Sequence, residues 1–308
     1  MRRFALVIAF IMPIAFDGVL LAEVAPEVLI VEKKEKLGLN DIKSLVKEAQ
    51  SADNSGSFEI AINLWKLILK IQIENLGKNH IDVGRSYNEK AILYSKLNRN
   101  NESISYFQKA LAIHETQLGR NDQDTISVLN NLSQAYMSND EYGNANKVIN
   151  RCLLILEKNK EIDNSTRAHT FFVAGSFYYE QGMLAKSEKY INNSYQLNLK
   201  KNGLNHLNTL TTLNWLADIY FEKGDYGKAK ELYKKVFDGY SALLAKDNPK
   251  IFGIMSDIAD TDFALGDSDS AINIYNKIIL NLENLRSKDN ADLAIYYTNL
   301  AYIFDELG

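Results

Sequence analysis

The fold of this chain is decided by the stretch LNWLADIYFEKGDYGKA, residues 213–229, in which two apolar helical patterns meet at Gly224. The pattern returns every 42 residues without a slip. The central residue of each unit, which we call the turn position, is glycine in five units and asparagine or aspartate in two. These residue types best tolerate a left-handed backbone. The seven turn positions are Gly56, Asn98, Asp140, Gly182, Gly224, Gly266 and Gly308.

Residue size marks the buried face of each helix. Seven residues before each turn position the residue is small, as at Ala217, and eleven before it the side chain is large and apolar, as at Leu213. Five residues after the turn position a second small residue follows, as at Ala229. The first two spacings lie on one helix face. Each helix pair carries two apolar stripes that only stacking of neighbouring pairs can bury, so the period predicts an all-α solenoid of antiparallel helix pairs.

The units resemble the tetratricopeptide repeat, most closely in LNNLSQAY at 129–136 and LNWLADIY at 213–220. The 42-residue period is similar to the kinesin light chain type rather than to the ordinary 34-residue repeat. The resemblance covers about residues 40–308 and implies a right-handed superhelix. Three residues depart from the family pattern: Glu48 and Lys90 fill a usually apolar position, and Asp262 replaces an aromatic residue. We expect a kink or a polar contact at Asp262.

The chain divides into three segments. Residues 1–22 have a short basic start and an apolar run, which predicts a secretory signal cleaved after Ala22. The alternatives are a membrane anchor at 4–22 and an N-terminus that is merely hydrophobic. Residues 23–38 are a charged leader, and 39–308 form the array of six helix pairs and a final unpaired helix. We therefore expect an exported protein, periplasmic or secreted, that is free of the membrane once the signal is removed.

The resemblance implies a peptide-binding groove along the first helices of the pairs. Its positions lie thirteen, ten, six and three residues before each turn position. Asparagine recurs at the second of these, where its carboxamide can both donate to and accept from a peptide backbone. The alternative is that these asparagines only bond neighbouring helices, and that the aromatic residues of the row are edge packing. The predicted groove residues are Arg85, Asn88, Asn130, Gln134, Tyr179, Asn214, Asp218, Phe221, Asp260 and Phe263.

Catalytic, cofactor and metal sites find no support in the sequence. The four histidines lack partners at metal-ligand spacing, and His80 and His206 fall at equivalent helix starts. The single cysteine, Cys152, occupies a small-residue position and is interpreted as core packing. With 35 Lys and Arg against 39 Asp and Glu, the net charge of −4 disfavours nucleic acid as a partner.

The array stops after the first helix of the seventh unit. Residues 291–307 are apolar on nearly every face, whereas a capping helix should turn a polar side to water. Either the next helix is missing from this sequence, or this helix docks on another chain, including a second copy of itself.

These patterns favour a protein-interaction scaffold that holds a protein or peptide partner in its groove and has no enzymatic activity. The alternative is the regulatory arm of a larger enzyme whose catalytic domain lies beyond residue 308.

Overall fold

A computed structural model describes residues 37–285 and 291–308. Within these ranges the chain forms one short helix, η1 (Leu39–Asp41), and thirteen α-helices, without a strand. The predicted all-α solenoid is confirmed. The α-helices are α2 (Ile42–Asn54), α3 (Phe58–Leu76), α4 (Ile81–Lys96), α5 (Asn100–Gln117), α6 (Gln123–Ser138), α7 (Tyr142–Lys158), α8 (Asn164–Glu180), α9 (Leu184–Asn202), α10 (Leu207–Glu222), α11 (Tyr226–Leu243), α12 (Pro249–Ala264), α13 (Ser268–Leu285) and α14 (Ala291–Leu307).

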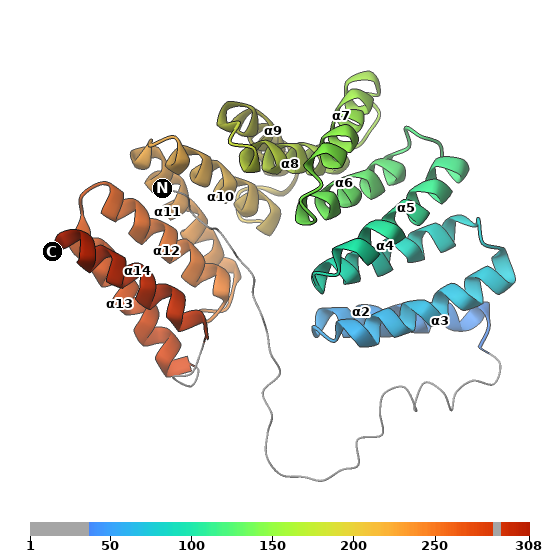
Figure 1. The fold of residues 1–308 in the computed structure, drawn as a ribbon, viewed down its shortest axis with the longest axis horizontal. Coiled ribbons are helices and arrows are strands. Elements are labelled where there is room, and N and C mark those ends of the chain that lie inside the picture. Colours follow the sequence, from blue (N-terminus) through green and yellow to red (C-terminus); the bar gives the residue numbers. More distant parts are fainter. Residues whose placement is uncertain (1–36, 286–290) are drawn as a thin grey trace, which may run out of the picture.

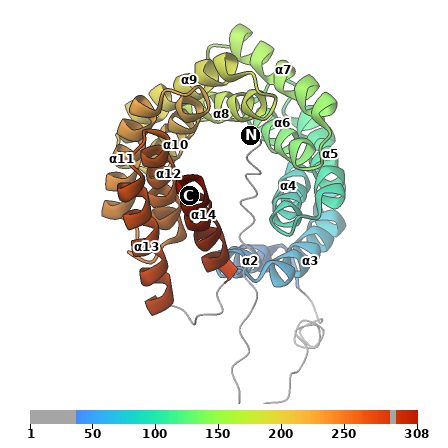
Figure 2. The same ribbon diagram turned by 60° about the vertical axis from the view of Figure 1, so that its left-hand side comes forward.

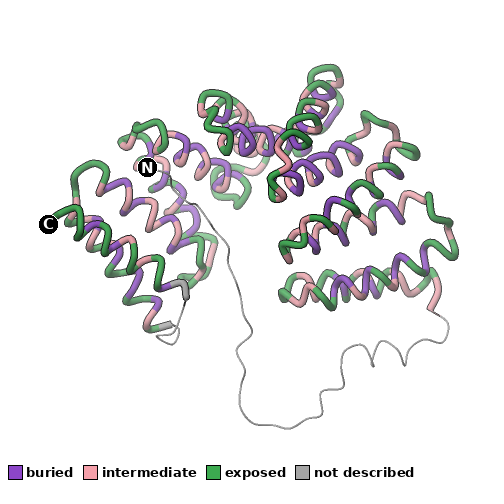
Figure 3. The backbone as a smooth tube through the Cα atoms, viewed as in Figure 1, coloured by how far each residue is buried: buried purple, intermediate pink, exposed green. Residues whose placement is uncertain are grey.

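The helices form an arch of stacked antiparallel pairs, from α2 with α3 at one end to α12 with α13 and then α14 at the other (Figure 1). The first helix of each later pair, α4, α6, α8, α10 or α12, lies on the inner side of the curve (Figure 2). The second helices lie on the outer side. Buried residues recur along the helices of the whole arch (Figure 3) and form a row of hydrophobic clusters, which we call the spine.

Every turn position has a left-handed backbone. At the six turn positions before Gly308, the N–H of the next residue donates to the carbonyl four residues before the turn position, as from Asp225 to Tyr220 at 2.9 Å. This bond closes the end of the first helix in the manner of a Schellman motif. The φ values are 76° at Gly56, 55° at Asn98, 56° at Asp140, 69° at Gly182, 78° at Gly224, 87° at Gly266 and 84° at Gly308.

The small residues allow the two helices of a pair to approach closely. Ala217 and Ala229 are both fully buried. In the pair of α8 and α9, Ser187 donates to the carbonyl of Gly175 at 2.8 Å. A Cβ added to Gly175 would lie 2.5 Å from the side chain of Ile191, so this position has no room even for alanine without a shift. Close packing of this kind makes size, rather than polarity, the constraint at these positions.

Two departures from the family pattern are buried polar contacts. Asp262 is buried in an unbroken α12, where its carboxylate lies 2.5 Å from Lys230 Nζ and accepts from Ser270 Oγ at 2.6 Å. Of the two expectations, a kink and a polar contact, the structure has the contact. Lys90 is also buried, and its Nζ donates to the Tyr106 hydroxyl at 2.8 Å.

The cysteine and two of the histidines have the structural positions expected of them. Cys152 is fully buried, and burial raises the pKa of its thiol to about 12. His80 and His206 each cap a helix start, because Nδ1 accepts the backbone N–H two residues later at 3.2 Å.

The predicted signal, residues 1–22, and nearly all of the predicted leader lie outside the described residues. Within the described part of the chain, no helix combines the length and apolar character that crossing a membrane requires.

Candidate functional site

The candidate site is the inner side of the arch, where α4, α6, α8, α10 and α12 present their predicted groove positions (Figure 2). The structure distributes the ten predicted residues over these five helices. Some are exposed or half-buried and some are engaged between helices. Whether they bind a partner stays a prediction, and their surroundings show which could.

The asparagine row consists of Asn88, Asn130 and Asn214, ten residues before their turn positions. Two of the three bond to residues of neighbouring helices. Asn88 accepts at Oδ1 from Asn131 at 3.1 Å, and Asn130 donates to Thr170 Oγ1 at 2.9 Å. Asn130 is only 1% exposed, so its amide is not presented to a ligand in this arrangement. Asn214 differs, because its Oδ1 is buried without a hydrogen-bond partner. An unpaired buried acceptor is uncommon in folded proteins.

The other polar residues of the predicted groove make hydrogen bonds to side chains. Gln134 lies 3.1 Å from Nε2 of His169, and Arg85 contacts two aspartates on the exposed surface of α4 and α6. Asp218 accepts from the Tyr233 hydroxyl at 2.7 Å, and Asp260 accepts from the hydroxyl of Tyr275. The pKa of Tyr275 is raised by burial and by the nearby Asp260 carboxylate. These acids therefore tie the inner helices to the outer ones.

An aromatic cluster joins α8 and α10. Trp215 makes edge contacts with Phe172 at 5.6 Å and with Tyr179 at 5.4 Å between ring centroids. All three side chains are half-buried, and Asn214 stands beside Trp215 in sequence. Edge-to-face packing of this kind fixes the rings while leaving apolar surface available. We call Phe172, Tyr179 and Trp215 the inner aromatic cluster.

The other two predicted aromatic residues, Phe221 and Phe263, also pack against aromatic rings. Phe221 packs edge-on against Tyr226 at 5.1 Å, and Phe263 packs against Tyr302 of α14 at 6.1 Å.

Sequence reasoning missed three residues of this region. Phe172 and His169 occupy the predicted groove positions ten and thirteen residues before Gly182, but they were not among the predicted residues. Trp215 lies one residue beyond such a position, so the register alone did not select it. Two features of the sequence could have pointed to Trp215: its large side chain and its place next to Asn214.

Nothing in the described ranges suggests a metal centre, since no group of three or more His, Cys, Asp or Glu side chains is placed to hold an ion.

A family model described as "Tetratricopeptide repeat" matches residues 49–116 and 166–242. Among curated proteins, a "Clustered mitochondria protein homolog" of Eremothecium gossypii is 23% identical over 181 residues. The match takes in 59% of this chain and 15% of the relative. A protein of the same description from Candida albicans is 22% identical over 209 residues, again 15% of its length. The chain therefore spans a small part of the curated relatives it matches.

The solved structures with a similar fold include the following three. Kinesin light chain TPR-like repeats described from "Podosopora anserina" are 18% identical, with a TM-score of 0.57 over 68% of this chain and 99% of that one. A STAND ATPase with a tetratricopeptide repeat sensor from Pyrococcus horikoshii is 17% identical, with a TM-score of 0.65 over 92% of this chain and 41% of that one. A Rap protein complexed with competence and sporulation factor is 15% identical, with a TM-score of 0.61 over 91% of this chain and 80% of that one.

Proposed function

We propose that this chain, a solenoid of tetratricopeptide repeats similar to those of kinesin light chain, is a non-enzymatic scaffold that holds a peptide segment of a partner on the inner side of its arch. The observation that carries the proposal is the inner aromatic cluster, together with the buried, unpaired Oδ1 of Asn214, the residue that precedes Trp215 in sequence. Aromatic rings supply anchor energy for apolar side chains, and the amide oxygen offers an acceptor to a peptide N–H after a small side-chain shift. The solved complex of a Rap protein with its factor lends support from the same fold.

The test is quantitative capture with the full chain and with the double variant Tyr179→Ala/Trp215→Ala. A protein retained by the wild type should lose about tenfold or more of its affinity for the variant, because both anchor rings are removed. The exposed Leu280, on the outer helix α13, provides the control substitution Leu280→Ala. Equal retention by wild type and double variant, with the helical circular dichroism of both intact, would exclude the inner aromatic cluster as the binding site.

The asparagine row needs separate variants. Asn130→Ala removes a buried bond to Thr170, so it should lower stability as well as any binding. Asn214→Ala removes an acceptor that has no partner, so it should leave the fold intact and report on binding alone. Unchanged partner affinity in Asn214→Ala would remove the carboxamide from the proposed mechanism.

A second candidate is the regulatory arm of a larger enzyme. It is favoured by the fold shared with the repeat sensor of the STAND ATPase, where the matching part is 41% of that chain. The coding sequence downstream of residue 308 distinguishes the two: an adjoining catalytic domain would favour the arm, and its absence the scaffold.

Self-association through α14 is a further candidate. Ile295, Phe304 and Leu307 are each more than half exposed on this helix, although Leu293, Leu300 and Ile303 pack into the core. Exposed apolar surface of this kind marks interaction faces. Light scattering across a concentration series should show a mass increase that Phe304→Glu abolishes. A monomer at every concentration would contradict it.

We also propose that the chain is exported after cleavage of residues 1–22, and that the mature form binds neither nucleic acid nor membrane. The basic start and apolar run of the N-terminus support export. Sequencing the N-terminus of the protein isolated from its native host tests it: an N-terminus at Glu23 agrees, and an intact Met1 does not.

A further inference from the structure

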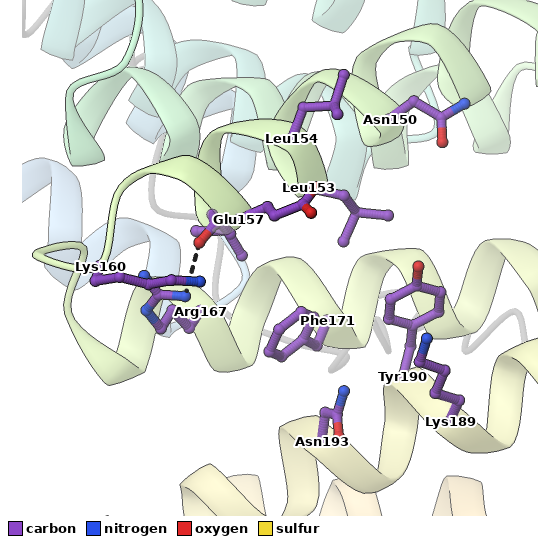
Figure 4. Close-up of a pocket in the computed structure, with 11 residues that line it drawn as sticks. Asn150, Leu153, Leu154, Glu157, Lys160, Arg167, Phe171, Lys189, Tyr190 and Asn193 are labelled. Atoms are coloured by element: carbon purple, nitrogen blue, oxygen red, sulfur yellow. Dashed lines mark hydrogen bonds between the residues drawn. The ribbon is translucent and has the colours of Figure 1, made fainter.

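One buried position of the repeat carries an arginine in α8. Fifteen residues before the turn position, five other units bury a smaller side chain, whereas α8 has Arg167. Its guanidinium caps the end of α7: Nε donates to the Ile162 carbonyl at 2.9 Å, Nη1 to Leu156 at 3.1 Å and Nη2 to Asn159. The Nη1 bond is the dashed line in Figure 4. The smaller residues are Val83, Thr125, Thr209, Ile251 and Leu293.

The bulk of Arg167 coincides with a change in how the pairs stack. On the inner side α8 packs against α6, and first helices of consecutive pairs approach each other more closely here than elsewhere in the described chain. The bond from Asn130 to Thr170 belongs to this contact. On the outer side α7 and α9 diverge (Figure 1). Between them lies a cleft of about 560 Å³, which we call the outer cleft.

The middle of the outer cleft is apolar. Leu153 and Leu154 line it from α7, and the rings of Phe171 and Tyr190 line it from α8 and α9 (Figure 4). The two rings are stacked at 6.0 Å, so they form one fixed surface. Leu154 is 54% exposed, so its side chain is accessible from solvent at the cleft. The volume is in the range of known ligand pockets and takes one or two large side chains.

The ends of the outer cleft are positively charged. Lys160 stands at the α7–α8 loop and Lys189 at the opposite end, on α9 (Figure 4). Neither ammonium has a carboxylate within ion-pair distance among the described residues. Glu157 is the one acid of the lining, against the three cations Lys160, Lys189 and Arg167. Lys189 Nζ also lies over the Tyr190 ring, 5.6 Å from its centroid. An apolar centre between two cations that lack carboxylate partners is complementary to an apolar side chain flanked by carboxylates.

We propose that the outer cleft is a second binding site, separate from the inner side of the arch, for a partner segment that carries a bulky apolar residue between acidic residues. The apolar side chain enters between Leu154 and the Phe171–Tyr190 pair. Its acidic neighbours pair with Lys160 and Lys189. Of the six units compared, only this one has arginine at the position fifteen residues before the turn position.

The experiment titrates the full chain calorimetrically with three acetylated, amidated hexapeptides. The first, Glu-Glu-Leu-Phe-Glu-Glu, should bind. The second replaces Leu-Phe by Ala-Ala, and the third replaces every Glu by Lys; both should bind at least about tenfold more weakly, since each removes one half of the complementarity. Binding of the first should weaken as salt is raised, because the charged ends are exposed to solvent.

The repeat supplies a matched pair of variants. Leu154 and Leu280 stand fourteen residues after their turn positions, in α7 and α13, and are 54% and 58% exposed. Leu154→Glu should weaken the acidic peptide at least about tenfold, because it places a charge at the apolar centre, while Leu280→Glu should change it less than about twofold. The double variant Lys160→Glu/Lys189→Glu should reverse the preference toward the Lys peptide.

Several results would overturn the proposal. They are no binding of the acidic peptide at millimolar concentration, equal binding of all three peptides, or equal effects of the two leucine variants. A loss of binding in Tyr179→Ala/Trp215→Ala, with Leu154→Glu unaffected, would place the peptide on the inner side instead. Both leucines are surface residues, so each variant should keep its fold, and circular dichroism verifies this.

Discussion

Two neighbouring junctions of the arch show how one repeat frame produces two surfaces. Where α9 meets α10, the buried position has Thr209, and Ile191, Leu210 and Leu213 belong to one closed cluster of buried residues. Where α7 meets α8, the same position has Arg167, and the outer side is open enough to form a cleft. The period is unchanged across both junctions. The two junctions therefore differ in this buried residue and in their outer surface while the register stays the same.

The largest expected effect is the difference in folding stability lost when a leucine of the spine and a leucine of the outer cleft are replaced by alanine. Leu213→Ala should lower the free energy of unfolding by about 2–5 kcal/mol, because it leaves a cavity at a residue that is 2% exposed. Leu154→Ala, the same change at the outer cleft, should stay within about 0.5 kcal/mol. Urea denaturation of both variants measures the difference. Similar losses in the two would show that Leu154 belongs to the spine and that the cleft is not open.

The next effect concerns the arginine itself. Arg167→Thr restores the residue type of Thr209, but it removes three hydrogen bonds to carbonyls at the end of α7. We expect a loss of about 1–3 kcal/mol, since the carbonyls lose their partners at a half-buried site. The acidic peptide should also bind more weakly, because the arginine that lines the outer cleft and bonds the end of α7 is lost.

The reciprocal change, Thr209→Arg, is the control for Arg167→Thr. Thr209 is fully buried, so an arginine there has no preformed set of carbonyls and should destabilise the chain more than Arg167→Thr does. If Thr209→Arg were tolerated without loss, the arginine would not be what distinguishes the two junctions.

The sequence was sufficient for the spine because spine positions are fixed by size and by the turn backbone. A residue such as Ala217 must be small in every unit, and the turn requires glycine, asparagine or aspartate, so both are visible as a period. Asp262 stood out against that period, but its partners Lys230 and Ser270 lie on other helices, and only the folded chain brings them together.

The candidate sites could be predicted less completely. Asn130 has the register of an inner-side residue, yet close packing of α6 and α8 buries it against Thr170. Arg167 lies two residues outside the predicted groove positions, and its consequence depends on the three-dimensional spread of α7 from α9. Stacking angles between pairs are set by such individual side chains, which a shared register does not reveal.

A smaller effect compares two equivalent positions in the outer helices. Cys152 of α7 and Ser194 of α9 stand twelve residues after their turn positions, and both are fully buried. The Ser194 hydroxyl has no hydrogen-bond partner. Ser194→Cys should therefore raise stability by about 1 kcal/mol, and Cys152→Ser should lower it by a similar amount. Thermal melting measures both, and a loss in Ser194→Cys would indicate that the hydroxyl is satisfied.

The smallest effect is expected for chemical modification of the Cys152 thiol in the folded chain. The outer cleft opens beside α7, but Cys152 belongs to the buried cluster beneath it, and burial raises the pKa of the thiol from 9.0 to about 12. The thiolate is the reactive species, so a disulfide reagent at pH 8 should modify the thiol only after unfolding.

The raised pKa of Cys152 also makes stability depend on pH. Between pH 9 and about 12 the thiol of the unfolded chain loses its proton, while the thiol of the folded chain keeps it. The unfolded state then binds fewer protons, and stability falls as pH rises through that window. Rapid labelling of the native chain at pH 8, with the thiol of denatured protein as the reference, would show that the cleft reaches through to the spine and that the two junctions differ more deeply than one arginine.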